Sequence, residues 1–161
     1  MKTVYLGLGS NLGDREASLR AALRALESPG LHILRVSPIY ETEPMDVPGQ
    51  NWFLNLVAEA ETELFPLQLL HRTSKIEIQL GRRRLTPKGA RVIDIDILLF
   101  GNAIIRKPRL EIPHPRFRER RFVLAPLADL APQLRDPVSG KSVRELLEAV
   151  VGQAVRKFGN I

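Results

Sequence analysis

The chain has 161 residues, of which 44% are hydrophobic and 26% charged, and its formal net charge is +6. This length fits one domain over residues 1–161 that buries roughly two thirds of the surface its unfolded chain would expose. No apolar run approaches the roughly 20 residues of a membrane span, the N-terminus lacks the features of a signal peptide, and there is no cysteine, so we expect a cytoplasmic protein.

The positive charge comes mostly from arginine, with 18 Arg against 6 Lys. The planar guanidinium matches phosphate oxygens, so a nucleotide or a nucleic acid is a plausible partner. Adaptation to heat would produce the same composition, and composition alone does not choose between the two.

The first half of the chain alternates short apolar runs with one amphipathic segment. Leucine and alanine at positions 19, 22, 23 and 26 have the spacing of one apolar helical face, and Pro29-Gly30 ends the pattern. The Gly-rich GLGSNLGD has neither a Walker lysine nor the dinucleotide spacing, so we expect Gly7 and Gly9 to allow a close approach of backbone and ligand. The expected elements are a strand at 3–8, a helix at 14–27, a strand at 32–40, an exposed loop at 42–52 and a strand at 53–64.

The second half begins with a helix that starts at Pro66 and ends before Gly81. The expected elements after it are a basic loop at 82–91, a strand at 91–101, a hairpin turn at 100–103 into a strand at 104–105, and helices at 122–130 and 142–151. The order strand, helix, strand, strand, helix, strand is that of a ferredoxin-like α+β sandwich. We therefore expect an antiparallel sheet with helices on one face and additional C-terminal helices, and we expect C-terminal elements to cover an edge of the sheet.

Two carboxylates interrupt the apolar strand RVIDIDILLFG. Asp94 and Asp96 are two residues apart, and because successive strand side chains point to opposite faces, they lie side by side. Adjacent carboxylates repel one another unless a cation neutralises them, and Mg²⁺ is commonly held by one or two carboxylates plus substrate phosphates. The pair predicts a magnesium site, or a bridge between two metal ions, and salt bridges to nearby arginines are the structural alternative.

Basic residues flank this strand on both sides. Such flanking suits phosphoryl-type transfer, in which positioning and charge neutralisation of the polyphosphate provide most of the catalysis. Taken singly, each residue also fits a solvated patch or a partner of a helix end. The set is Arg82, Arg83, Arg84, Lys88 and Arg91 before the strand, and His114, Arg116, Arg118, Arg120 and Arg121 after it.

Three further polar side chains have suitable surroundings. Asn55 shares a strand face with Phe53, and an amide beside a ring can read the edge of a flat heterocycle, although an amide at a strand edge is the simpler interpretation. Glu77 lies near the end of the second predicted helix and could orient an arginine of the basic loop or form an ordinary ion pair. His114 is restrained between two prolines, which suits a fixed donor to phosphate as well as a surface histidine.

The segments GLGSNLGD, TEP, FLN, IEIQLGRRR, GARVIDIDILLFG and IPHPRFRERRFVLAPL resemble, in order and over nearly the whole chain, the 6-hydroxymethyl-7,8-dihydropterin pyrophosphokinases of folate biosynthesis. The resemblance implies transfer of pyrophosphate from ATP to the pterin's hydroxymethyl oxygen, with release of AMP, on a ferredoxin-like core. It implies that Asp94 and Asp96 hold two Mg²⁺ ions against the ATP phosphates, and that Asp96 helps to deprotonate the hydroxyl. We expect a monomer whose partners are ATP and the pterin, and which binds neither nucleic acid nor a membrane.

Matching motifs carry the family's site residues onto this sequence. By resemblance, the pterin pocket corresponds to Thr42, Pro44, Met45, Phe53, Asn55 and Phe122, with Asn55 reading the ring edge between the two phenylalanines. The ATP side corresponds to Glu77, Arg82, Arg84, Arg91, Ile97, His114 and Arg120, and the catalytic residues are Arg82, Arg91 and Asp96. The family's mobile loops fall at 9–14, 43–52 and 82–91, and their closure would exclude water.

The chain departs from the family pattern at a few positions. Lys88-Gly89-Ala90-Arg91 stands where Trp-Gly-Pro-Arg is frequent, Ser74 replaces a glutamine of some members, and Pro115 stands where an aromatic is common. We expect these departures to change nucleotide affinity and to leave the chemistry unchanged.

Two functions of other classes compete with this prediction. A nucleic-acid-binding ferredoxin-like module would carry a Lys/Arg-Gly-Phe-type motif on a central strand, and the sequence has none. The second is a regulatory fold that binds nucleotide without catalysis. The loss of Asp94, Asp96, Arg82 or Arg91 would favour it, and the sequence retains all four.

Overall fold

The computed structural model describes residues 1–43, 51–81 and 92–161. Its main sheet has the strand order β5-β1-β4-β3-β8, with β2 also paired to β4, and its pairings are antiparallel. The elements in chain order are β1 (Lys2–Ser10), α1 (Arg15–Leu26), β2 (Leu31–Val36), β3 (Ile39–Thr42), β4 (Phe53–Thr62), α2 (Pro66–Gln79), β5 (Asp94–Phe100), β6 (Ile105–Lys107), β7 (Leu110–Ile112), the short 3-10 helix η1 (Phe117–Glu119), α3 (Arg121–Leu130), α4 (Val143–Ala149) and β8 (Val155–Gly159).

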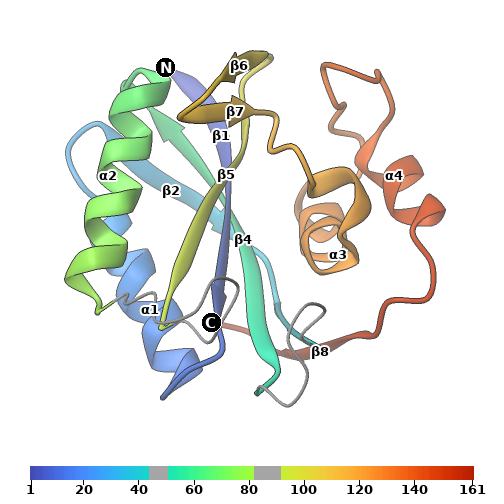
Figure 1. The fold of residues 1–161 in the computed structure, drawn as a ribbon, viewed down its shortest axis with the longest axis horizontal. Helices are drawn as coiled ribbons and strands as arrows, with labels where there is room; N and C mark the ends of the chain where they lie inside the picture. The colour runs from blue at the N-terminus through green and yellow to red at the C-terminus, as the bar shows by residue number, and fades with distance from the viewer. Residues whose placement is uncertain (44–50, 82–91) are drawn as a thin grey trace.

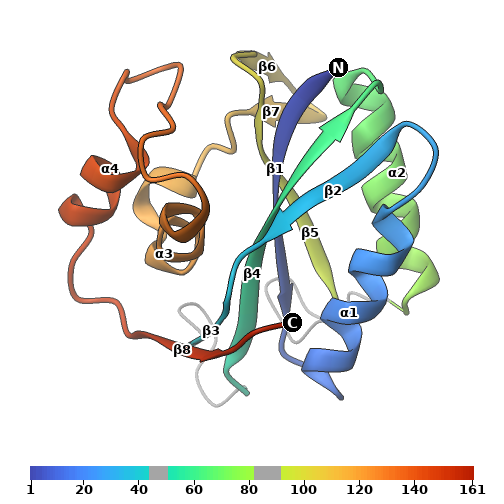
Figure 2. The ribbon, with the colours of Figure 1, turned by 180° about the vertical axis from the view of Figure 1, so that it is seen from behind.

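Helices cover both faces of this sheet. Figures 1 and 2 show α1 and α2 on one side and α3 and α4 on the other. A first core packs Leu19, Leu26, Leu69 and other side chains of α1 and α2 against the sheet, and a second core packs α3 and α4 against the opposite face. The arrangement is the ferredoxin-like α+β fold, and the two C-terminal helices are additions on the second face, so the predicted fold class is confirmed.

The two predicted N-terminal helices are present because their local signals agree with their packing. The side chain of Asp14 accepts a hydrogen bond of 3.1 Å from the backbone N–H of Ala17 and so caps α1. Pro66 occupies the first turn of α2, where its missing N–H costs nothing. That helix ends near Gly81, whose φ of +95° is a conformation that glycine adopts readily.

The structure corrects three predictions about the strands. The strand expected at 32–40 is two strands, β2 and β3, because the chain is interrupted at Ser37-Pro38, where the Ser37 hydroxyl accepts a hydrogen bond from the N–H of Val57 and Pro38 has no N–H to give. The strand expected at 104–105 does not form a hairpin with the preceding strand, since β6 pairs with β7 in a separate two-stranded sheet.

The third correction concerns the C-terminus. The helix expected at 142–151 ends at Ala149, and the chain then returns to the sheet as β8, a strand that was not predicted. β8 pairs with β3 and forms one edge of the main sheet. Among the described residues, no helix has the length and apolar character needed to cross a membrane.

Candidate active site

The glycines of β1 lie between the predicted pterin and metal residues. Gly9 is the partner of Asn55 on β4 and of Asp94 on β5. Gly7 is likewise the partner of Asp96 on β5. Because directly opposed residues of antiparallel strands share a face, Asn55 and both aspartates lie on the same face of the sheet, the one that α3 and α4 partly cover.

Because Gly7 and Gly9 have no side chains, neighbouring side chains approach the backbone of β1 on this face. Neighbouring strands are about 4.8 Å apart, so β4 and β5 are separated by roughly 10 Å with no side chain of Gly9 between them. A Cβ atom placed on Gly9 would lie 2.8 Å from the Oδ1 atom of Asn55, closer than carbon and oxygen normally approach. The Asn55 side chain therefore approaches the backbone of Gly9, and the expected close approach of a ligand to this backbone stays a prediction.

Three of the predicted pterin residues within the described part of the chain, Thr42, Phe53 and Asn55, lie at one end of β3 and β4. Thr42 is the register partner of Phe53, and the Nδ2 atom of Asn55 donates a 2.7 Å hydrogen bond to the hydroxyl of Thr42. Both Asn55 and Thr42 are buried, at 7% and 3% exposure, so this contact fixes the orientation of the amide. Phe122 lies in the first turn of α3 and is half-buried against the second core.

Asp94 and Asp96 are half-buried, and the residue between them is anchored by Glu77. The Oε2 atom of Glu77 accepts a 2.8 Å hydrogen bond from the backbone N–H of Ile95. Since β5 is an edge strand in the described part of the sheet, this buried carboxylate satisfies a backbone donor on the side where none of the described strands pairs with β5. Ile97, predicted on the ATP side, packs its side chain into the first core, on the face opposite the aspartates.

His114 is held as a neutral donor close to Asp94. Burial and the positive charge of Arg120 lower its pKa to about 4, and the opposing effect of Asp94 is smaller. Its Nδ1 atom accepts a 3.1 Å hydrogen bond from the backbone N–H of Arg116, so the proton of the neutral ring is on Nε2. The imidazole therefore has one N–H to donate at neutral pH.

Arg120 links the two predicted binding regions. Its guanidinium carbon lies 5.5 Å from the centre of the Phe122 ring, a cation–π distance. Its charge also acts on His114, as the lowered pKa of that histidine indicates. A residue predicted on the ATP side and one predicted in the pterin pocket are thus in contact.

Five predicted site residues lie outside the described part of the chain: Pro44, Met45, Arg82, Arg84 and Arg91. The same holds for the departure at Lys88-Gly89-Ala90-Arg91.

The donor set on β5 fits the predicted magnesium ions. Within residues 1–43, 51–81 and 92–161, no group of three or more acidic, histidine or cysteine side chains could hold a metal by itself. Two half-buried carboxylates on one face are the protein ligands that Mg²⁺ takes when phosphate oxygens and water complete its coordination. Asp94 and Asp96 therefore fit a metal that arrives with a polyphosphate.

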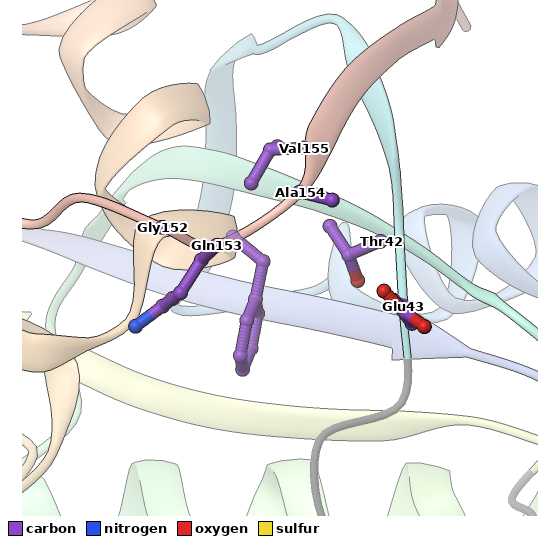
Figure 3. A pocket seen from close by; sticks show the side chains of 7 residues that line it. Thr42, Glu43, Gly152, Gln153, Ala154 and Val155 are labelled. Carbon is purple, nitrogen blue, oxygen red and sulfur yellow. The ribbon is translucent and has the colours of Figure 1, made fainter. Parts of the chain in front are cut away.

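A cavity beside two of the predicted pterin residues was not expected from the sequence. A cavity of about 210 Å³ is lined by Thr42, Glu43 and Phe122 and by residues 152–155 of the C-terminal segment, as Figure 3 shows for its labelled residues. The segment VGQAVRKF has weak β-type alternation, which was the available signal, but nothing local in it indicates a partner.

The comparisons with known proteins agree with this geometry. Residues 5–132 match the family model described as 7,8-dihydro-6-hydroxymethylpterin-pyrophosphokinase (HPPK). The chain is 42% identical over 159 residues to the 2-amino-4-hydroxy-6-hydroxymethyldihydropteridine pyrophosphokinase of Pseudomonas aeruginosa, covering 98% of both chains. It is 47% identical over 131 residues to the enzyme of the same name from Bacillus subtilis, covering 81% of this chain and 78% of that one.

Longer proteins match as well. The chain is 41% identical over 155 residues to the folic acid synthesis protein fol1 of Pneumocystis carinii, but spans only 21% of its length. A crystal structure of wild-type Plasmodium falciparum HPPK-DHPS with pterin and p-hydroxybenzoate has the same fold, with a TM-score of 0.73 at 19% identity over 91% of this chain and 41% of that chain.

Proposed function

Since the chain belongs to the 7,8-dihydro-6-hydroxymethylpterin-pyrophosphokinase family, we propose that it transfers pyrophosphate from ATP to the hydroxymethyl group of 6-hydroxymethyl-7,8-dihydropterin. The observation that carries the proposal is the row across the sheet, in which Asn55 and Asp94 both face Gly9. The amide proposed to read the pterin and a carboxylate proposed to hold a metal then lie on one face of the sheet, on the two strands that flank β1. Transfer between two substrates requires this adjacency, because the reacting atoms must meet.

The pterin binds at the Asn55 end of the row. Thr42 holds the Asn55 amide by its 2.7 Å hydrogen bond, so the Oδ1 acceptor has a fixed direction. Phe53 and Phe122 supply aromatic faces for a flat ring. A buried amide in a fixed orientation discriminates well, because a ligand that fails to pair with it leaves a polar group unsatisfied.

The triphosphate binds at the Asp94 end of the row. Asp94 and Asp96 would hold two Mg²⁺ ions, which when bound neutralise charge on the phosphate oxygens. Neutral His114 donates from Nε2 and Arg120 donates from its guanidinium, so both stabilise phosphate oxygens without needing a change of protonation. Arg82, Arg84 and Arg91 are proposed to contact the phosphates as well, with Arg82 and Arg91 steadying the transferred group.

The reaction balances as a displacement at the β-phosphorus. The hydroxymethyl oxygen forms a bond to the β-phosphorus, the bond from that phosphorus to the oxygen bridging the α-phosphate breaks, and AMP leaves. The proton of the hydroxymethyl group passes to the carboxylate of Asp96. Asp94 would continue to hold metal against the phosphates. Exclusion of water from the site favours the pterin hydroxyl over hydrolysis.

Phosphorus NMR of the protein with ATP, Mg²⁺ and 6-hydroxymethyl-7,8-dihydropterin tests this proposal. We expect AMP and a pterin-linked diphosphate to appear together. Formation of ADP with a pterin monophosphate would mean attack at the γ-phosphorus and would contradict the proposed chemistry. Absence of any reaction would contradict the proposed function as a whole.

We also propose that residues 1–161 act as one pyrophosphokinase domain and as a monomer in the cytoplasm. Light scattering on the purified chain should then give a mass near 18.1 kDa. A mass of twice that value would contradict the monomer.

A further inference from the structure

The C-terminal strand is fastened beside the proposed pterin pocket. β8 pairs with β3 so that Val155 is the partner of Thr42. Arg156 donates hydrogen bonds of 3.1 and 2.7 Å to the Oε1 atom of Glu41, and its guanidinium lies 4.8 Å from the centre of the Trp52 ring. These contacts hold the start of β8 at the end of β3 where the pterin residues gather.

The segment that leads into β8 lines the same cavity as two predicted pterin residues. The cavity of about 210 Å³ is bounded by Thr42 and Glu43 from the end of β3, by Phe122 from α3 and by residues 152–155. Figure 3 shows Gln153, Ala154 and Val155 along one side of it and Thr42 along another. The C-terminal segment therefore faces the space that Thr42 and Phe122 face.

Gln153 ties this segment to the turn that precedes α3. Its Oε1 atom accepts a 2.9 Å hydrogen bond from the backbone N–H of Arg121, and its Nε2 atom donates a 2.9 Å hydrogen bond to the carbonyl oxygen of Glu119. One amide thus bonds the backbone on both sides of Arg120. The guanidinium of Arg121 adds a 3.0 Å hydrogen bond to the carbonyl of Val150.

These hydrogen bonds allow Gln153 to fix the backbone that carries Arg120, proposed to bind phosphate, and Phe122, proposed to contact the pterin. The Arg121 N–H lies in the first turn of α3 and belongs to the donors that a helix leaves unpaired, so the glutamine serves as a cap supplied from a distant segment. The turn that it fixes carries Arg120 and leads directly into Phe122. Movement of this turn would displace a phosphate donor and an aromatic wall together.

We propose that residues 152–155 form a wall of the pterin pocket and that Gln153 is a positioning residue that holds Arg120 and Phe122 in place. The inference rests on the proposed function, and it assigns a role to residues that lie beyond the family-model match of 5–132. The wall limits the size of the heterocycle on the side of Thr42 and Phe122. Because Gln153 belongs to the wall and is hydrogen-bonded to the backbone next to Phe122, a shift of the wall would also shift Phe122.

The wall is tested by adding bulk to it in the full chain. Ala154→Trp should raise the Kd for 6-hydroxymethyl-7,8-dihydropterin at least about tenfold, measured by calorimetry with α,β-methylene-ATP present, because the indole fills the cavity. Lys157→Trp is the matched control, since Lys157 is exposed on the adjoining strand β8 and does not line the cavity. Both variants should bind the ATP analogue with unchanged Kd. An unchanged pterin Kd in Ala154→Trp would overturn the proposal that residues 152–155 form a wall of the pterin pocket.

The positioning role is tested by removing the amide. Gln153→Ala should lower kcat/KM for the pterin about tenfold or more at a temperature well below its Tm, since two hydrogen bonds that fix the turn are lost. Gln153→Glu keeps an acceptor for the Arg121 N–H and should recover part of the loss. Gln133→Ala, at an exposed glutamine of the same chain, should match the wild type. A Gln153→Ala variant with a lower Tm and an unchanged kcat/KM would overturn the positioning role.

The wild-type chain separates this inference from the proposed function. Wild-type turnover together with normal pterin binding by Ala154→Trp would overturn the inference alone. A wild-type chain that binds no pterin and forms no AMP would overturn the proposed function and the inference with it.

Discussion

Asn55 and Asp94 lie in one row across the main sheet, each directly opposite Gly9 of the strand between them. The two residues are 39 positions apart in the sequence (94 − 55), and they meet because β1 pairs with β4 on one side and with β5 on the other. In the proposed reaction, the residues that orient the pterin and those that hold the metal ions on the phosphates would thus lie on three neighbouring strands, β4, β1 and β5. The predictions below follow from this row and its supports.

Asp96→Ala should reduce turnover at least about a thousandfold, because the site loses a metal ligand and the proposed proton acceptor. Asp96 is half-buried and not part of either apolar core, so the Tm should change little. Single-turnover measurements over a range of Mg²⁺ concentrations, with circular dichroism on the same sample, check the prediction. Near-normal turnover of a folded variant would contradict the proposal that Asp96 is a metal ligand.

Asn55→Leu should raise the Kd for the pterin by about ten- to a hundredfold, since the near-isosteric leucine keeps the volume and loses the amide. The buried hydroxyl of Thr42 also loses its donor, so we expect a modest fall in Tm. Calorimetric titration with the pterin and separately with an ATP analogue is the measurement. Asn102→Leu, at an exposed turn residue, serves as the control, and equal losses for both ligands would argue against a pterin-specific role.

Gly9→Ala should raise KM for the pterin by up to about a hundredfold, because the new methyl group would lie 2.8 Å from Asn55 Oδ1 and must displace that amide. Gly159→Ala is the matched control, since a Cβ atom there meets nothing within 4 Å. Steady-state kinetics with the pterin varied at saturating ATP gives the comparison. A wild-type KM in Gly9→Ala would contradict the proposal that the Asn55 amide beside Gly9 orients the pterin.

Glu77 allows a structural role to be separated from a role toward ATP. Glu77→Ala should lower the free energy of unfolding by about 1–3 kcal/mol, because the buried N–H of Ile95 loses its acceptor. Glu77→Gln retains an acceptor oxygen and should restore most of that stability. Urea unfolding and kcat are measured on the same three proteins. Normal activity in Glu77→Gln would show that the carboxylate charge is not needed at the ATP side.

His114 should make the wild type lose stability as the pH falls from about 6.5 towards 4. Its pKa is lowered from 6.5 to about 4 in the folded chain, so the unfolded chain binds more protons in this window and the free energy of unfolding rises with pH across it. The contribution is complete above pH 6.5, where His114 is neutral in both states.

The comparison variant is His114→Gln, which stays neutral at every pH. Urea unfolding at about pH 7 and about pH 5, without Mg²⁺ or ATP, should show a smaller loss for the variant than for the wild type. The same loss in both proteins would mean that His114 does not titrate as its surroundings indicate.

Local periodicity was sufficient for much of the fold. The helices at Arg15–Leu26 and Pro66–Gln79 follow from apolar spacing, an Asp cap and a first-turn proline, all of which act within one or two turns. The strand period of two was also enough to place Asp94 and Asp96 on one face. Both inferences depend on contacts between residues close in sequence.

Strand pairing was less predictable. The pattern at 104–105 indicated a strand, but its partner β7 was chosen by tertiary packing over the preceding strand β5. Pro38 was a local sign of a break in the strand. The contact that divides the segment into β2 and β3 comes from Val57, which lies 20 residues from Ser37. A one-dimensional pattern does not contain the register between distant segments.

The sequence by itself determined which residues have the chemistry: two carboxylates on one strand face, arginines on both sides, an amide beside a ring, and the motifs of a pterin pyrophosphokinase. Only the tertiary structure decided that Asn55 and Asp94 share a row over Gly9, that Glu77 anchors the backbone between the aspartates, and that Gln153 returns from the C-terminus to the pocket. The physical reason is that side-chain type and local periodicity are encoded residue by residue. Register, edge pairing and the return of a distant segment are set by the packing of the whole chain.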